Sequence, residues 1–490
     1  MDQNNECPNI LIIQSDQHRY DCMGYSQAYP VHTPNIDRLA AEGMWFSNAY
    51  TPIPLCCPAR QTLLSGKRPE AMGCLWNYDS ALPTRALDPG EFTWTKELSQ
   101  QGYRTGYLGK WHVNPHHDPI DFGFDEYISD QDYSAMRNGK FPDVRFENGF
   151  LGETDPVPLE FTRTHWTADQ AVRLMEQYKK EGAPWHMRLD FHDPHLPCRP
   201  ADPFATMYKP EDIPMWKSFR DNFNNKPYIQ KQQLYNWGVQ DYSWEDWAPI
   251  VARYYSLISQ MDDAVGHVLR ALERLGMADN TMVIYTSDHG DMCGGHRMLD
   301  KHYIMYDDVV KVPLVIRWPG KIDAGTHCHA FVYNALDLPP TLLEVAGLDA
   351  PSFLHGRSLI PHLYGEDVTD WRLEAVSTYN GQQFGLYTQR MIRTTEWKYV
   401  WNTTDVDELY HLRSDPDELI NCIHEPRIEG ILHELRGRLY AELRRTGDGL
   451  VASEWMKTQL LMGTKIVDFS PRKEGGDDNN QSGSEMDMAP

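Results

Sequence analysis

The stretch Asn9-Ile-Leu-Ile-Ile-Gln-Ser15 is a short apolar run that ends in polar residues, and Asp16 and Gln17 follow it directly. A continuous apolar run of this length predicts a buried strand, of the kind found in parallel sheets that are covered on both faces. We expect it to be the first strand of the sheet, with Asp16 and Gln17 delivered by its C-terminal end.

Helices and strands are then predicted to alternate along the chain. Thr33-Pro34-Asn35 predicts a helix start, with an N-cap and a proline in the first turn, and Gly43 predicts its end. Three more pairs of helix and strand follow, at 95–101 and 104–108, 167–180 and 185–191, and 251–275 and 281–286. This order predicts an α/β fold with a large doubly wound, mostly parallel sheet flanked by helices.

The character of the sequence changes toward the C-terminus. After an extended run at 312–318 and a helix near 336–346, short strand-like runs begin at about Ala375, and a last helix is predicted at 428–445. We therefore expect three parts: an α/β domain over 1–370, a smaller α+β subdomain with a short antiparallel sheet and a helix over 371–469, and a flexible tail over 470–490.

The composition limits the possible partners. The net charge of -24 opposes binding to nucleic acid or to an anionic membrane. No apolar run approaches the roughly 20 residues that span a bilayer, and the N-terminus lacks the features of a signal peptide, so we expect a soluble, cytoplasmic protein. The nine cysteines are an odd number without compact spacing, which favours reduced thiols.

Polar residues follow four of the predicted strands: Asp16, Lys110, His195 and Asp288. Ligands of doubly wound sheets bind outside the carboxyl ends of the strands, so we expect these residues to converge at one edge. Oxygen and imidazole donors that suit a divalent cation come from Asp16, Gln17, Asp288 and His289. The alternative is that they are ordinary polar turn residues at strand ends.

A cysteine motif decides between these alternatives. Cys56-Cys-Pro-Ala-Arg60 precedes Gln61–Gly66, which predicts the start of an amphipathic helix. A helix N-terminus favours negative charge and lowers the pKa of a thiol, so Cys56 is a candidate nucleophile. Together with Asp16-Gln17, Lys110 and the segment 287–290, this motif predicts one anion-handling site.

The motifs make the chain resemble the type I sulfatases of the alkaline-phosphatase-like superfamily over nearly its whole length. The resemblance is carried by Cys-x-Pro-x-Arg at 56–60, Gly-Lys-Trp-His at 109–112, His192-Asp-Pro-His-Leu-Pro197, Ser-Asp-His-Gly at 287–290, and Lys301. Glu408-Leu-Tyr-His-Leu, followed by Asp415-Pro416, resembles the C-terminal subdomain of that family.

The resemblance implies a formylglycine-dependent sulfuric ester hydrolase, arylsulfatase-like, that acts on a small anionic sulfate ester such as a sulfated carbohydrate or an aryl sulfate. A formylglycine-generating or sulfatase-maturating enzyme would convert Cys56 to formylglycine, whose aldehyde hydrates to a diol. One hydroxyl attacks sulfur, and the other loses its proton and expels inorganic sulfate. Ca²⁺ is the expected metal, before Mg²⁺ or Mn²⁺, with these implied ligands: Asp16, Gln17, Cys56, Asp288 and His289.

The resemblance also implies roles for the charged residues. Arg60 would brace the diol, and Lys110 and Lys301 would neutralise the sulfate oxygens. His112 is the implied base for the second hydroxyl, and His195, with Lys301, the implied acid for the leaving alcohol.

The acid role has a second candidate, since His192 lies in the same motif as His195. We rank His195 first because it stands directly before Leu-Pro, as the family histidine typically stands before x-Pro. Substrate contacts are expected from loops and the C-terminal subdomain, in particular from 76–80, 114–118 and 382–384.

Two departures from the family pattern leave alternatives open. Gln17 stands where many sulfatases have a second aspartate, and Ala59 stands where serine is commoner. Both features resemble the phosphonate monoester hydrolases, relatives that cleave phosphonate and phosphate diesters, but Lys110 and His112 favour the sulfatase. A non-catalytic anion- or glycan-binding protein is a third interpretation, which the intact metal and nucleophile motifs oppose.

Overall fold

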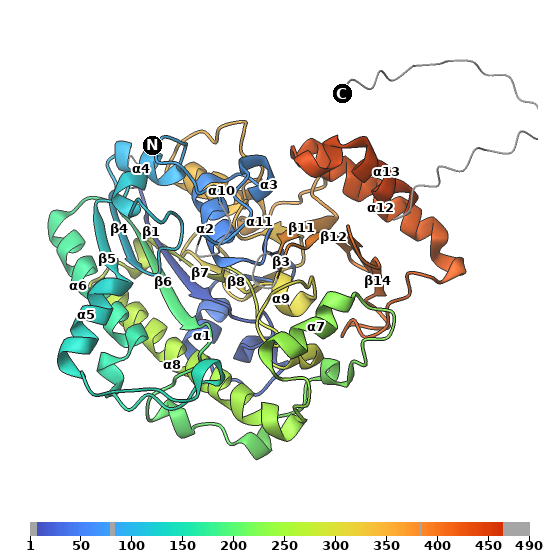
Figure 1. The fold of residues 1–490 in the computed structure, drawn as a ribbon. Helices are drawn as coiled ribbons and strands as arrows, with labels where there is room; N and C mark the ends of the chain where they lie inside the picture. Colours follow the sequence, from blue (N-terminus) through green and yellow to red (C-terminus); the bar gives the residue numbers. More distant parts are fainter. Residues whose placement is uncertain (1–6, 79–83, 382–384, 464–490) are drawn as a thin grey trace, which may run out of the picture.

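The computed structural model describes residues 7–78, 84–381 and 385–463. The expected tail at 470–490 and the expected pocket segment 382–384 lie outside these residues. Figure 1 shows a large body of strands and helices, with the C-terminal helices α12 (Glu429–Arg445) and α13 (Glu454–Met462) at one side.

An eight-stranded sheet forms the centre of the large body. Its order is β5-β4-β6-β1-β7-β8-β2-β9, and all neighbours run parallel except β8, which is antiparallel to β7 and to β2. The strands are β1 (Asn9–Asp16), β2 (Met44–Phe46), β4 (Arg104–Gly109), β5 (Glu126–Ser129), β6 (Trp185–Pro194), β7 (Thr281–Ser287), β8 (Leu314–Arg317) and β9 (Thr326–Cys328). Every residue of β1 is buried, because β1 lies between β6 and β7. The predicted doubly wound, mostly parallel sheet is confirmed.

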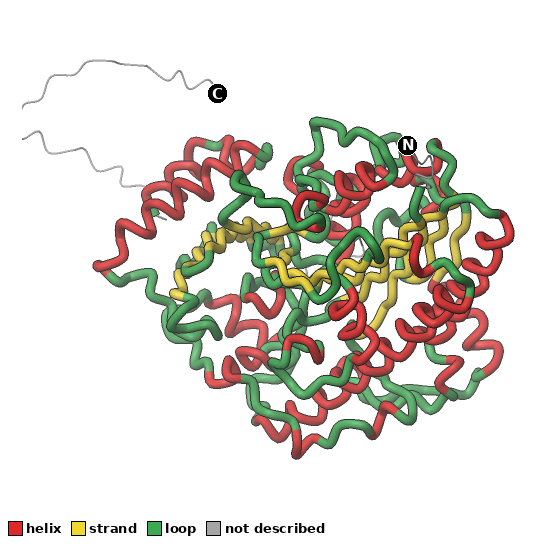
Figure 2. Tube along the Cα trace, turned by 180° about the vertical axis from the view of Figure 1, so that it is seen from behind, coloured by secondary structure: helices red, strands yellow, loops and turns green. Residues whose placement is uncertain are grey.

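Helices cover both faces of this sheet, as Figure 2 shows from behind. One face packs against α1 (Pro34–Glu42), α6 (Arg163–Glu181) and α8 (Trp244–Arg274), and the other against α2 (Cys56–Ser65), α4 (Trp94–Gln100), α10 (Leu338–Val345) and α11 (Ile360–Leu363). The remaining strands of this part are β3 (Ala49–Tyr50) and β10 (Val332–Tyr333), which pair with each other, and its remaining α-helices are α3 (Pro69–Met72), α5 (Asp130–Lys140), α7 (Tyr228–Trp237) and α9 (Asp307–Val310). Across the described ranges, none of the helices has the length and apolar character needed to cross a membrane.

Helix α1 begins where the sequence predicts, but its cap comes from a distant helix. The Thr33 hydroxyl donates to Asp37 at 2.8 Å and does not cap the helix. Asp262 of α8 instead accepts hydrogen bonds from the backbone N–H groups of Asn35 at 3.0 Å and Ile36 at 2.8 Å. These are N–H groups that a helix leaves without an internal partner. Thr33 is therefore the N-cap residue, as predicted, but the capping hydrogen bonds come from Asp262.

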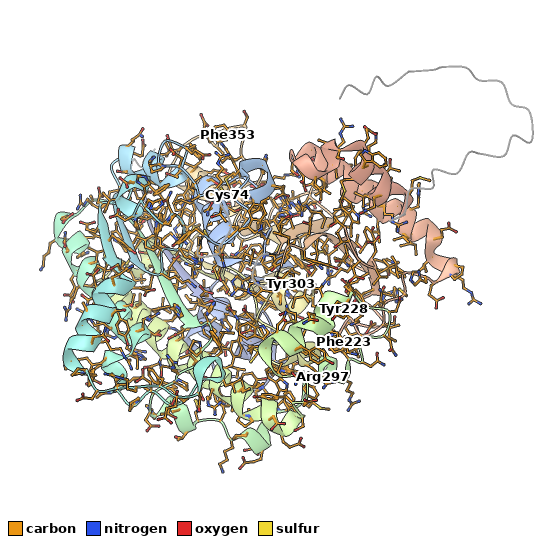
Figure 3. All side chains as sticks on the ribbon, viewed as in Figure 1. Cys74, Phe223, Tyr228, Arg297, Tyr303 and Phe353 are labelled. Carbon is orange, nitrogen blue, oxygen red and sulfur yellow. The ribbon has the colours of Figure 1, made fainter. Side chains whose placement is uncertain are left out.

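A four-stranded antiparallel sheet lies beside the large body. Its strands are β11 (Glu374–Asn380), β12 (Thr388–Thr394), β13 (Trp397–Asn402) and β14 (Glu408–His411), and α12 and α13 pack on it. Its other side shares a core cluster with the large body, where Tyr303 contacts Tyr379 and Tyr387; Tyr303 is labelled in Figure 3. The antiparallel sheet is as predicted, and the domain boundary near 370 stays a prediction.

Candidate active site

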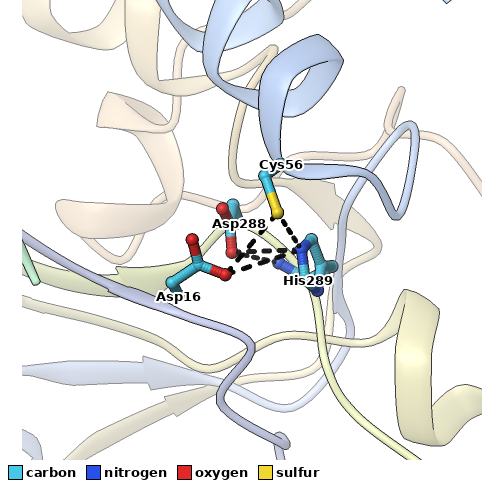
Figure 4. Close-up of side chains that lie close together, drawn as sticks. All are labelled: Asp16, Cys56, Asp288 and His289. Atoms are coloured by element: carbon cyan, nitrogen blue, oxygen red, sulfur yellow. Dashed lines mark hydrogen bonds and ion pairs between the residues drawn. The ribbon is translucent and has the colours of Figure 1, made fainter. Parts of the chain in front are cut away.

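The carboxyl ends of the parallel strands bring the predicted site residues to one edge of the sheet. Asp16 is the last residue of β1, Lys110 follows β4, His195 follows β6, and Asp288 follows β7. This is the edge at which α/β sheets bind their ligands. Figure 4 shows Asp16 and Asp288 there, facing Cys56.

Helix α2 presents Cys56 to this edge. It begins at Cys56 itself and not at Gln61, and all of its residues are buried, so the predicted amphipathic helix is wrong in its start and in its exposure. The reason is its position, since α2 contacts α3, α4 and α10 and has no solvent face. Cys56 is therefore in the first turn, where free N–H groups favour a negative side chain.

The surroundings of Cys56 stabilise a thiolate. Its Sγ lies 3.2 Å from Nε2 of His289 and 3.7 Å from Oδ1 of Asp16. Burial alone raises the pKa of this thiol, but Lys110, Lys301 and His289 together hold its pKa well below the usual range. The site therefore favours negative charge at this position.

Four residues form a cluster of donor atoms: Asp16, Cys56, Asp288 and His289. One donor atom from each lies within 4.8 Å of the others, and all four side chains are buried (Figure 4). The ring of His289 is oriented by its Nδ1, which lies 2.9 Å from the Gly290 carbonyl oxygen, so that Nε2 faces the cluster. Two carboxylates and an oriented imidazole are a donor set that fits a divalent cation.

Charge is balanced within this cluster by protons and lysines. Burial and Cys56 raise the pKa of Asp16, but Lys110, His195 and Arg60 outweigh them and lower it to about 2. Burial lowers the pKa of His289, whereas Asp288 and Cys56 raise it to about 9.

Arg60 connects the carboxylates beneath the cluster. Its guanidinium donates to Asp16 at 3.1 Å, to Asp288 at 3.1 Å and to Asp190 at 2.8 Å, and it is fully buried. Asp190, on β6, is a site residue that the sequence analysis missed. A carboxylate close to the C-terminal end of the predicted strand 185–191 was the available sign. Arg60 thus aligns the two carboxylates of the metal cluster through a bridge to β6.

Two lysines from distant segments reach the cluster. Lys110 forms an ion pair with Asp16. Nζ of Lys301 lies 2.8 Å from Oε1 of Gln17 and 3.1 Å from Oδ1 of Asp300. Burial lowers the pKa of both lysines, but Asp16 raises that of Lys110, and Asp300 raises that of Lys301, above the ordinary value. Both lysines therefore keep their positive charge in the site.

The histidines occupy distinct places. His112 adopts a left-handed backbone with φ 46°, hydrogen-bonds the Cys56 side chain and makes an edge contact with Tyr78. His195 Nε2 lies 3.0 Å from Lys301 Nζ. The ring of His192 is 5.4 Å from that of His195, and burial, with nearby cations, lowers its pKa well below the usual range.

Gln17 joins the site through hydrogen bonds to carboxylates. Its backbone N–H donates to Asp288 at 3.1 Å, and its amide Nε2 donates to Asp291 at 2.9 Å and to Asp300 at 3.1 Å. Asp291 and Asp300 are further residues that the sequence analysis missed. Asp291 directly follows the Ser-Asp-His-Gly motif and Asp300 directly precedes Lys301, so adjacency to the motifs was the sign that could have found them.

A pocket of 1160 Å³ opens onto Cys56, Lys110, His112, His195 and Lys301. The predicted wall 114–118 lines it, as do residues 77 and 78 of the predicted wall 76–80; residues 79–80 lie outside the described chain. Two aromatic side chains, Phe150 and Trp237, also line it, with their rings in edge contact at 5.3 Å. The pocket is larger than a sulfate group requires and has room for the rest of a substrate.

Comparison with known proteins agrees with this geometry. Residues 8–348 match the sequence profile of the sulfatase family, and residues 294–445 match that of the N-sulphoglucosamine sulphohydrolase C-terminal region. The chain is 28% identical to an arylsulfatase of Clostridium perfringens, in an alignment that covers 90% of this chain and 95% of that protein.

Solved structures share the fold. A protein in complex with its substrate D-glucosamine-2-N,6-O-disulfate is 23% identical, with a TM-score of 0.75 over 91% of this chain and 99% of that one. The phosphonate monoester hydrolase of Agrobacterium radiobacter is 26% identical, with a TM-score of 0.78 over 90% of this chain and 96% of that one. The matched family profile, the relatives and the site motifs agree: the chain belongs to the sulfatase family and is a sulfuric ester hydrolase of the alkaline-phosphatase-like fold.

Proposed function

We propose that this sulfatase hydrolyses sulfate monoesters of carbohydrates, with formylglycine derived from Cys56 as the nucleophile and Ca²⁺ as the metal. The observation that carries the proposal is the convergence of Cys56, two carboxylates, an oriented imidazole and two charged lysines at the base of one pocket. This arrangement concentrates positive charge around a buried nucleophile, which is what the transfer of an anionic group requires.

The metal proposal rests on the donor atoms. Asp16, Asp288 and His289 would hold the ion, together with the side chain at position 56. Gln17 is a further candidate, because its Oε1 accepts one hydrogen bond from Lys301 and an amide oxygen has a second lone pair. Oxygen donors in this number favour Ca²⁺ over softer metals, with Mg²⁺ and Mn²⁺ as alternatives. A divalent cation here would polarise the oxygen atoms it binds and neutralise their charge.

Formylglycine would supply a diol, with one hydroxyl to attack sulfur and one to expel sulfate. The folded chain supports conversion during synthesis, since Cys56 is only 2% exposed and an enzyme could not reach its thiol after folding. A maturation enzyme is therefore a proposed partner of the unfolded chain. His112, which hydrogen-bonds the side chain at position 56, would accept the proton of the second hydroxyl.

The lysines and His195 would act on the substrate. Lys110 and Lys301 remain charged and would neutralise the sulfate oxygens as charge develops on them. The contact between Lys301 and His195 would provide the proton for the leaving alcohol. Arg60 would act indirectly, since its donors are engaged with carboxylates and a carbonyl group.

Two observations support a carbohydrate as the rest of the substrate. The pocket combines aromatic faces at Phe150 and Trp237 with amide, histidine and carboxylate side chains, and such a mixture suits a ring with apolar faces and polar edges. In addition, the C-terminal region matches a profile described for N-sulphoglucosamine sulphohydrolase, a sulfated-sugar enzyme by its name.

A phosphonate monoester hydrolase of the same superfamily is the second candidate, favoured by Gln17 and by the structural likeness to the Agrobacterium radiobacter enzyme. Lys110 and His112 beside Cys56 favour sulfate. The test is kcat/KM for 4-nitrophenyl sulfate against a 4-nitrophenyl phosphonate monoester, on protein whose conversion of Cys56 is checked by peptide mass. Preference for sulfate supports the proposal. Preference for the phosphonate, or full sulfatase turnover by Cys56→Ala, would refute it.

A further inference from the structure

Arg163 is a cation in the pocket wall whose hydrogen-bonding capacity the protein leaves largely unused. It is the first residue of α6 and lines the same pocket as Cys56, with its side chain 32% exposed. Within the described chain, its side-chain contacts are Asp130, with 3.9 Å between Nη1 and Oδ2, and the ring of Tyr133 at 5.2 Å. A separation of 3.9 Å is too long for a hydrogen bond, so the guanidinium N–H donors remain available.

The other cations of the site differ from Arg163 in this respect. Lys110 is paired with Asp16, Lys301 lies 3.1 Å from Asp300, and Arg60 donates to three buried carboxylates. Their positive charges are therefore matched by buried negative charges before a substrate binds. Arg163 has a loose, partly exposed ion-pair partner in Asp130, which an incoming anion could replace at small cost, and it also acts electrostatically on the buried carboxylate of Asp193.

The remaining carboxylates of the pocket wall are engaged elsewhere. Asp118 accepts a hydrogen bond from the backbone N–H of Ile120 at 2.9 Å. Asp121 pairs with His117 at 2.8 Å. Both carboxylates therefore already have hydrogen-bond donors of their own, and neither forms an ion pair with Arg163 in the described chain.

Arg163 lies close to the site that handles sulfate. His192 lines the pocket beside it, and after burial Arg163 is the strongest influence that lowers the pKa of His192. The ring of His192 is 5.4 Å from that of His195, whose Nε2 contacts Lys301. The pocket wall thus presents Lys301, the two histidines and Arg163 in succession, with a second cation beyond the sulfate position.

We infer that Arg163 forms a second anion subsite, and that the substrate is a sulfated sugar bearing a second anionic group, either a carboxylate or a further sulfate. The inference rests on the proposed function, since it takes the first anionic group to be the sulfate ester that is cleaved. A guanidinium binds either group with two parallel hydrogen bonds, and the pocket of 1160 Å³ has room for the ring between the two anions.

The test is competition against 4-nitrophenyl sulfate by matched sugars. D-glucosamine-2-N,6-O-disulfate is compared with N-acetylglucosamine 6-O-sulfate, and a hexuronate 2-O-sulfate with its methyl ester. We expect at least one two-anion sugar to inhibit about tenfold more strongly than its one-anion counterpart. Arg163→Gln should remove this preference, and Asp130→Asn should enlarge it, because Asp130 competes with the incoming anion. The first pair reports a second sulfate and the second pair a carboxylate.

Arg173→Gln is the matched control, because Arg173 is an exposed residue of the same helix and its loss changes the net charge equally. Arg173→Gln should keep the wild-type ratio of inhibition between the two-anion sugar and its one-anion counterpart. The inference is wrong if neither pair shows a preference, or if Arg163→Gln keeps the preference. Failure of the proposed function looks different, since wild-type protein with converted Cys56 would then release no sulfate. Titration calorimetry with the same sugars would still measure the ratio of their affinities.

Discussion

Nζ of Lys301 lies 3.0 Å from Nε2 of His195, and this contact defines which ring nitrogen of the histidine accepts a hydrogen bond. An ammonium group can only donate, so Nε2 accepts, and Nδ1–H donates to the carbonyl oxygen of Leu196 at 2.6 Å. The pair therefore holds one transferable proton, and Lys301 carries it. A leaving alkoxide that approaches this pair meets a charged donor.

The first prediction concerns the leaving group. His195→Ala and Lys301→Ala should lower kcat/KM for alkyl sulfates by about 10²–10⁴-fold, and for 4-nitrophenyl sulfate much less, because a nitrophenolate leaves without a proton. The measurement is the slope of log kcat/KM against leaving-group pKa. Lys110→Ala is the control, and it should lower kcat/KM to a similar extent for all substrates. Equal losses across the series in the His195 variant would show that His195 has no role in proton transfer to the leaving group.

The second prediction concerns the pH profile of Asp300→Asn. Burial lowers the pKa of Lys301, and Asp300 is the main group that raises it above its ordinary value. Without that carboxylate, Lys301 should lose its proton at lower pH. The alkaline limb of kcat/KM for an alkyl sulfate should therefore move to lower pH.

Asp291→Asn is the matched control for this experiment, since Asp291 also accepts from Gln17 but forms no ion pair with Lys301 in the described structure. A lower plateau with an unmoved alkaline limb in Asp300→Asn would indicate a purely structural role for Asp300.

The third prediction explains why glutamine stands at position 17. Its amide nitrogen donates to Asp291 and to Asp300, and a carboxylate could not. Glutamate has the same shape as glutamine, but Gln17→Glu would place a third carboxylate beside those of Asp291 and Asp300. The free energy of unfolding should therefore fall by about 2–4 kcal/mol. Urea denaturation measures it. Adding Asp291→Asn should restore part of the loss, and an unchanged unfolding midpoint in Gln17→Glu would contradict the account.

The fourth prediction concerns acid stability. His18 is buried, with Nδ1 2.6 Å from the Tyr285 hydroxyl oxygen and Nε2 2.9 Å from the Cys22 carbonyl oxygen. Burial is the main cause that lowers its pKa from 6.5 to about 4. As the pH falls, His18 therefore binds its proton in the unfolded chain before it does so in the folded chain. The free energy of unfolding should fall as the pH drops from 6.5 toward 4.

This group should contribute up to roughly 3 kcal/mol to the loss of stability on acidification. His18→Gln cannot titrate, so the variant should lose less stability than wild type between neutral and acidic pH in urea denaturation. Identical pH dependence in the two proteins would show that His18 does not control acid stability.

The fifth prediction concerns removal of the metal. Chelation should abolish sulfate release and lower the melting temperature, since a bound ion at 100 times its Kd stabilises the fold by about 2.7 kcal/mol. Restoration by Ca²⁺, Mg²⁺ and Mn²⁺ in turn identifies the metal. In Asp288→Asn, chelation should lower the melting temperature by less than in wild type, because this variant lacks one ligand of the cluster. Full activity after exhaustive chelation would show that the reaction does not need a metal ion.

Local sequence patterns were enough to predict the framework of this protein. The apolar run before Asp16 predicts a fully buried central strand, and the polar residues after it predict the edge at which the site forms. Local patterns of this kind survive folding, because a buried strand must be apolar along its length and a ligand-binding edge must be polar. The cysteine motif likewise predicts the nucleophile, Cys56.

The groups that hold these residues in place could be identified only in the folded chain. Asp190 is bridged to the metal carboxylates by Arg60 from another element, and Asp262 caps a helix more than 200 residues away in the sequence. Helix α2 begins at Cys56 and is buried because other helices enclose it. Neither a partner across the fold nor the burial of a helix is encoded in local spacing. Both depend on packing, which brings charges together at distances where hydrogen bonds form.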